Sequence, residues 1–202
     1  MVERLPEGAN VVGPRAVVRL KQAEYDRVWD RFSKRFGFRP GMARSTWPAI
    51  REPVESVTWS LDRLDDDPGD VQLDAMVAAV HAGLRECTPP RGTLLVLDWQ
   101  HECFRIRPHR VAAGDGSVWV PSVMPDADYH IHLAENFSYG TFGHPWERTL
   151  CVMGSPLLDR VGGSVKVEPP YTAAEAVKRL RGHDGRSCCS MRRSLSALRS
   201  VS

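Results

Sequence analysis

The 202-residue sequence has no run of 18 consecutive apolar residues, which argues against a membrane-spanning helix. Residues 1–13 contain acidic residues and a proline where a secretory signal peptide needs an apolar run. We therefore expect a cytoplasmic protein that does not contact a membrane, in which residues 1–13 form a loose leader. Lysine is also scarce, with 4 lysines against 23 arginines. This bias is typical of a GC-rich genome and points to a bacterial source.

Several motifs with known chemistry are missing as well. The five cysteines are odd in number and form no C-x-x-C pair, so neither a disulfide framework nor a zinc knuckle is expected. The serine-hydrolase motif G-x-S-x-G and the dinucleotide-binding motif G-x-G-x-x-G are both absent. We expect no cofactor, and the sequence alone does not decide whether the protein is an enzyme.

Basic residues are concentrated in the last part of the sequence. Residues 177–202 contain seven Lys or Arg and one acid, a net charge of +6, out of totals of 27 basic and 25 acidic residues. Residues 1–176 therefore carry 20 basic and 24 acidic residues, a net charge of −4. Phosphate binding needs a clustered basic face, so the body is not expected to bind nucleic acid. We expect the Ser/Arg-rich segment 177–202 to be a disordered tail.

Two segments have the apolar period of a long helix. Tyr25, Val28, Trp29 and Phe32 form one apolar stripe, and residues 71–87 carry a second one. Apolar alternation or continuous apolar runs predict strands. These strand predictions cover residues 55–61, 93–99, 103–107, 117–120, 129–133 and 149–153, with a loop over 135–143. The pattern predicts a single α+β domain over residues 14–176, with a mainly antiparallel sheet of five or six strands and the two long helices packed on one face.

The tetrapeptide His144-Pro145-Trp146-Glu147 is the first candidate site. His144 is a possible general base that Glu147 would orient, if the two side chains come within hydrogen-bond reach. The alternative is structural, because Pro145 can stiffen the loop and Trp146 can fill a gap beside the sheet. Both alternatives remain open from the sequence.

A second candidate lies where the predicted central strand ends, at Asp98, Trp99 and His101. The ends of buried strands often line clefts. If this strand and the one beginning at Thr149 are neighbours, Asp98 and His101 would share one pocket with His144 and Glu147.

Asp128, His130 and His132 alternate along one predicted strand, so their side chains fall on the same face. Two imidazoles and a carboxylate are ligands that zinc accepts. The alternative is a solvent-facing edge strand without a metal. We expect no metal, and keep these three residues as the alternative site.

Three segments, all between residues 20 and 160, together resemble a bacterial family described as domain of unknown function 2716. They are Glu24–Pro40, Leu97–His101, and Gly140–Glu147 followed by Thr149–Val152 and Gly154. Because that family is uncharacterised, the resemblance implies no reaction. It also implies aromatic residues where His130 and His132 stand here, which counts against a metal site common to the family. The sequence after about Val161 departs from the family pattern.

Two classes of function follow from these observations. The first is a binding or protein-interaction module, of the kind that protects against a partner toxin, with the Trp/His/Glu loop as its recognition surface. The second is a small hydrolase-type enzyme that uses His144 with Glu147 or Asp98 as acid and base groups. We favour the first class, because the residue types alone do not demonstrate a catalytic geometry.

Overall fold

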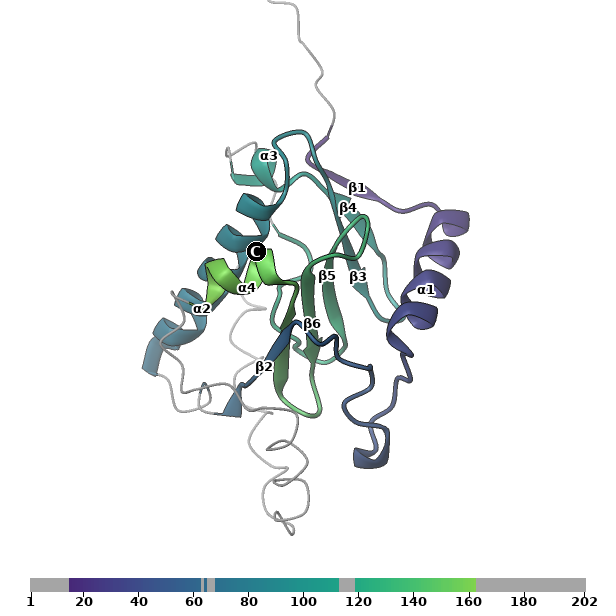
Figure 1. Cartoon of the computed structure of the whole chain (residues 1–202), viewed down its shortest axis with the longest axis vertical. Helices are drawn as coiled ribbons and strands as arrows, with labels where there is room; N and C mark the ends of the chain where they lie inside the picture. The colour runs from purple at the N-terminus through teal and green to yellow at the C-terminus, as the bar shows by residue number, and fades with distance from the viewer. Residues whose placement is uncertain (1–14, 63, 65–67, 113–118, 163–202) are drawn as a thin grey trace, which may run out of the picture. The chain divides into compact units, whose positions relative to one another are not determined.

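The centre of the fold is one antiparallel sheet of seven strands in the order β1-β4-β3-β5-β6-β7-β2 (Figure 1). The computed structural model describes residues 15–62, 64, 68–112 and 119–162. The strands are β1 (Val17–Arg19), β2 (Ser56–Ser60), β3 (Leu94–Asp98), β4 (Phe104–Ile106), β5 (His130–Ala134), β6 (Gly140–His144) and β7 (Thr149–Met153). The helices are α1 (Gln22–Phe36), α2 (Val71–Cys87), α3 (Pro108–Ala112) and α4 (Ser155–Val161), with short 3-10 turns at Arg44–Thr46 and Pro68–Asp70.

The predicted α+β class and the antiparallel sheet are confirmed, but the sheet has seven strands instead of five or six. The additional central strand is β6, which lies where the sequence predicts a loop over residues 135–143. Its two glycines interrupt the apolar alternation, so the pattern does not reveal a strand that tertiary pairing creates. The strand expected at 117–120 lies partly outside the described residues, and Trp119 and Val120 are not in a strand.

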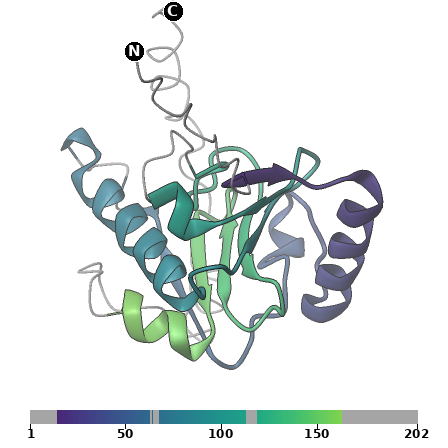
Figure 2. The ribbon, with the colours of Figure 1, turned by 90° about the horizontal axis from the view of Figure 1, so that it is seen from above.

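The prediction that both long helices pack on one face is wrong, because α1 and α2 cover opposite faces of the sheet (Figure 2). The apolar run of β3 explains this arrangement. Leu95 and Leu97 pack with Phe32 of α1, whereas Leu94 and Val96 pack on the other face with α2 and α4. A strand that is apolar on both faces needs a cover on both faces.

Helix α1 contains the predicted apolar stripe of Tyr25, Val28, Trp29 and Phe32. Its apolar stripe packs on the sheet through Phe32 and Phe36, and Gly37 ends the helix in the left-handed conformation, with φ 62°. Helix α2 has the predicted bounds and buries Met76, Val80 and Leu84, the side chains at helical spacing. Burial of each large apolar side chain stabilises the fold by roughly 1.5–3 kcal/mol.

All described residues belong to one compact unit. The predicted leader, the domain limit at residue 176 and the basic tail lie outside the described residues. Within the described part, no helix combines the length and the apolar character that a membrane crossing requires.

Candidate functional site

The candidate residues do not share one pocket, because Asp98 and His144 lie on opposite faces of the sheet. Asp98 continues the row of Leu94 and Val96, which faces α2. His144 continues the row of Phe142, which faces α1. Neighbouring residues of a strand point to opposite faces, so the register of the three strands decides the question. The shared pocket was expected only if β3 and β7 are neighbours, and this condition is not met because β5 and β6 lie between them.

His144 is a buried structural residue with no exposed surface. Its Nδ1 accepts the backbone N–H of Glu147 at 3.0 Å, so the ring carries its proton on Nε2, which has no hydrogen-bond partner among the described residues. Burial lowers the pKa of His144 to about 4. The ring packs edge-on against Tyr129, with centroids 4.9 Å apart. A neutral, enclosed imidazole whose acceptor nitrogen is already used cannot take a proton from an external substrate.

Glu147 is the second half of the predicted pair, and its backbone, not its carboxylate, contacts His144. Burial, followed by the nearby charge of Glu52, raises the pKa of Glu147 to about 7, against the hydrogen bond from Thr149. Thr149 donates its hydroxyl to the carboxylate at 3.5 Å. The Glu147 carboxyl group therefore titrates near pH 7, although no histidine side chain of the described structure contacts it.

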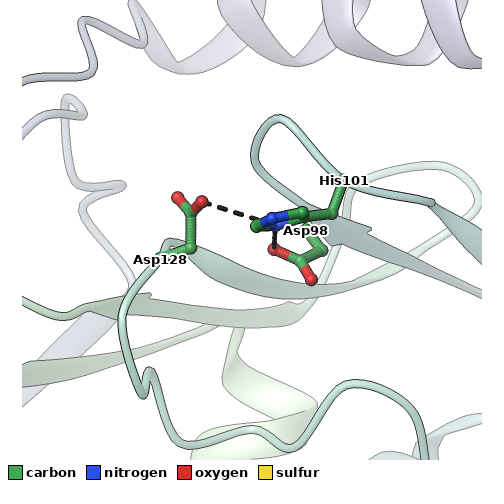
Figure 3. A group of neighbouring side chains, drawn as sticks. All are labelled: Asp98, His101 and Asp128. Atoms are coloured by element: carbon green, nitrogen blue, oxygen red, sulfur yellow. Dashed lines mark hydrogen bonds and ion pairs between the residues drawn. The ribbon is translucent and has the colours of Figure 1, made fainter.

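Three side chains converge at the end of β3 and the start of β5, namely Asp98, His101 and Asp128 (Figure 3). His101 Nδ1 lies 3.0 Å from Asp98 Oδ1 and 3.5 Å from Asp128 Oδ2. A tight turn directs the histidine back, since Gln100 has φ 66° and the His101 N–H donates to the Asp98 carbonyl at 3.2 Å. Asp128 joins them because β5 pairs antiparallel with β3.

The three groups differ in exposure. The His101 side chain is 60% exposed, whereas those of Asp98 and Asp128 are 18% and 13% exposed. The hydrogen bond to Asp98 raises the pKa of His101 above its usual value. Partial burial raises the pKa of Asp128, against the hydrogen bond from the Tyr129 N–H. The cluster thus has one accessible imidazole between two enclosed carboxylates.

His130 and His132 both face α2, and neither lies on a solvent-facing edge strand, because β5 is the middle strand of the seven. They have different neighbours. His130 Nε2 lies 3.9 Å from Asp98 Oδ1 and 3.4 Å from Asp126 Oδ1. His132 instead lies against the rings of His81 and Trp119, with centroids 6.4 and 6.0 Å away. The prediction that alternation puts both rings on one face is correct, but each ring has its own surroundings.

His81 and His132 form a separate buried polar group. Burial lowers the pKa of His81 to about 4 and that of His132 to about 3. Neither ring nitrogen of His132 makes a well-formed hydrogen bond with the described residues, although the Pro121 carbonyl lies close enough to favour the protonated ring. Nε2 of His81 and Oγ1 of Thr141, on the neighbouring strand, also have no hydrogen-bond partner in the described structure. These rings are held neutral in an apolar environment.

Trp99 and Trp146 lie together on the α1 side of the same sheet end. Their ring centroids are 6.5 Å apart at a near-perpendicular angle, and both pack on Tyr129. Each tryptophan is only partly buried. The two sequence candidates therefore meet through their tryptophans, and not through their histidines.

The sequence does not predict that Asp126 and Asp128 lie beside Asp98 and contact His130 and His101. The spacing of Asp98 and His101 indicates a local pair. The partners from residues 126–130 depend on the register in which Asp98 opposes His130, which no local pattern specifies.

The fold and this cluster define a class of α+β protein with one seven-stranded antiparallel sheet covered on both faces. The family model described as "Protein of unknown function (DUF2716)" matches residues 19–158, and the chain belongs to this family. It is similar to the uncharacterized protein YxiI of Bacillus subtilis (strain 168), with 24% identity over 147 residues, which cover 70% of this chain and 90% of the relative. No solved structure matches the chain.

Proposed function

We propose that the protein is a bacterial, cytoplasmic interaction module that binds another protein, in a protective or immunity-like role, through the surface around Trp99 and Trp146. The observation that carries this proposal is the pair of partly exposed tryptophans, packed edge to face at 6.5 Å. Tryptophan is enriched among the residues that dominate binding energy at protein interfaces, because a rigid indole buries a large area with little loss of entropy.

The charges beside this pair favour a basic partner. The side chain of Asp126, at the same sheet end, is 76% exposed. Complementary charge around an apolar centre mainly increases the rate of association and excludes wrong partners. A partner that offers an apolar pocket rimmed by Arg or Lys would fit this surface.

A pull-down from the native cytosol tests the proposal. We expect the wild type to retain a partner, and Trp146→Ala and Asp126→Lys to lose it. Asp126→Lys is the sharper variant, since its exposed side chain leaves the core intact, and Asp30→Lys on α1 is the matched control for charge reversal. Retention of no partner, or equal loss with Asp30→Lys, would refute the proposal.

A hydrolase-type enzyme is the second proposal, and the observation that favours it is the Asp98–His101 pair. His101 Nδ1 is held by Asp98 at 3.0 Å on a side chain that is 60% exposed, so Nε2 is available to an external substrate. This is the arrangement of a general base that a carboxylate orients. The pair replaces His144, which is enclosed.

Hydrolysis of chromogenic carboxyl and phosphoryl esters tests this second proposal. His101→Gln is expected to abolish any activity of the wild type, whereas His144→Gln leaves the rate per folded molecule unchanged. Activity that survives His101→Gln, or none in the wild type, would remove the enzyme from consideration.

A further inference from the structure

His130 has a fixed tautomer. Its Nδ1 lies 2.9 Å from the carbonyl oxygen of Ser122 and 2.8 Å from that of Met124. A carbonyl oxygen can only accept a hydrogen bond, so Nδ1 carries the proton and donates it. Nε2 is therefore the nitrogen with the free lone pair in the neutral ring.

That lone pair points at negative charge. The His130 side chain is only 5% exposed, and its Nε2 lies 3.4 Å from a carboxylate oxygen of Asp126 and 3.9 Å from one of Asp98. Nε2 makes no hydrogen bond within the described part of the chain. A lone pair facing two carboxylates is unfavourable unless a proton or a metal ion lies between them.

We propose that a divalent transition-metal ion binds at this point, held by Asp98, His101, Asp128 and Nε2 of His130. One ligand atom from each of Asp98, His101 and Asp128 lies within 4.8 Å of the others. The individual separations of 3.0, 3.5 and 3.9 Å between nitrogen and oxygen atoms suit ligands of one ion. Donor atoms at about 2.0–2.2 Å from a metal are roughly 3–4 Å apart.

The hydrogen bonds made by the other ring nitrogen of His130 are also those expected of a histidine that binds a metal. A histidine that binds a metal through one nitrogen usually donates the other N–H to a backbone carbonyl or a carboxylate, which fixes the ring and increases its basicity. The Ser122 and Met124 carbonyls supply this contact. In the absence of the ion, a proton between His101 Nδ1 and Asp98 would balance part of the same charge.

Two imidazoles and two carboxylates indicate the class of ion. Imidazole nitrogen suits zinc, iron, nickel and copper, whereas magnesium and calcium prefer all-oxygen ligand sets. With carboxylates as the remaining ligands, Mn²⁺ to Zn²⁺ are the ions that fit. The proposal does not rest on the protein-binding surface: Asp126 borders both sites, but Trp99 and Trp146 lie on the opposite face of the same strand end.

The experiment uses the full chain, stripped with a chelator and titrated separately with Zn²⁺ and Mn²⁺ in competition with a chromogenic chelator, with bound metal counted by mass spectrometry. Manganese is included because thiolates such as those of Cys188 and Cys189 bind zinc but compete poorly for manganese. We expect one ion per chain. Asp98→Asn and His130→Gln are expected to weaken binding on the order of 100-fold or more, because each removes a ligand, beyond the 10–100-fold typical of second neighbours.

Asp128→Asn gives a ligand variant that keeps the size of the side chain, and Asp30→Asn is the control, an exposed carboxylate on α1. Far-UV circular dichroism of each variant identifies any that fails to fold. Binding that both Asp98→Asn and Asp128→Asn weaken, while Asp30→Asn does not, supports the site. Absence of metal binding in the wild type, or binding that these ligand variants leave unchanged, overturns the metal site. The metal titration is read separately from the pull-down and the ester assay, so its failure is distinguishable from the failure of either proposed function.

Discussion

Acidification should destabilise the protein through His132, and the size of the effect follows from its burial. His132 is fully buried, and burial holds its pKa in the folded state at about 3, against 6.5 for an exposed histidine. The neutral ring therefore stabilises the fold fully above pH 6.5, and this contribution decreases as the pH falls toward 3. At pH 5, about 1.5 pH units below the unfolded value, the loss is about 2 kcal/mol at 1.36 kcal/mol per pH unit.

This magnitude depends little on the folded pKa, because any folded value well below 5 gives the same loss at pH 5. His132→Leu removes the titrating group at similar volume. It also removes two buried nitrogen atoms that make no well-formed hydrogen bond with the described residues, so the variant should be about as stable as the wild type at pH 8. Between pH 8 and pH 5 the wild type should lose about 2 kcal/mol more than the variant.

Urea unfolding followed by tryptophan fluorescence measures this difference at both pH values. Thr141→Val is the matched control, since Thr141 pairs directly with His132 and also has a buried oxygen without a partner in the described residues, but does not titrate. Its pH-dependent loss should equal that of the wild type. If His132→Leu loses as much stability on acidification as the wild type, the reasoning from burial is refuted.

Three further substitutions test other parts of the fold. Glu147→Gln should increase the unfolding free energy by up to about 3 kcal/mol at pH 8 and by under about 1 kcal/mol at pH 5, because the folded state, in which the pKa of Glu147 is about 7, disfavours the charged carboxylate that Gln replaces. Equal effects in urea unfolding at both pH values would contradict this. Gly140→Ala should lower stability by about 3 kcal/mol or more in thermal unfolding, since its Cβ would overlap the His132 carbonyl, whereas Gly69→Ala, in open space, should cost about 1 kcal/mol. Arg105→Met should cost about 1–3 kcal/mol at pH 7 and less at pH 4, because it leaves two partly exposed glutamates without their shared guanidinium; a loss independent of pH in urea unfolding would exclude that cause.

The elements that the sequence predicts well are those in which the apolar spacing repeats over several turns. Residues 71–87 carry several turns of apolar spacing, and α2 has these bounds. The strand β6 was missed because Gly140 and Gly143 erase the alternation, and its place between β5 and β7 comes from distant partners. The opposite placement of α1 and α2 was also missed, although the continuous apolar run of β3 indicates two covered faces.

The candidate site was predictable only where its contacts are local. Asp98 and His101 are three residues apart and meet across one turn. The separation of Asp98 from His144 depends on two strand registers, and a shift of one residue would put both side chains on the same face. For the same reason, the contact between Asp98 and His130 could not be derived from alternation within one strand.

The pairing of β2 with β7 determines when the sheet can be completed during synthesis. Ser56 pairs with Met153, which follows it by 97 residues. At a translation rate of about 5–20 residues per second, the ribosome needs roughly 5–20 s to produce the partner of a finished β2. During that interval β2 has an unpaired edge and Trp59 lacks its β7 neighbour Leu150. The early half of the chain therefore carries, until β7 is made, a strand segment whose unpaired backbone groups can pair with other chains.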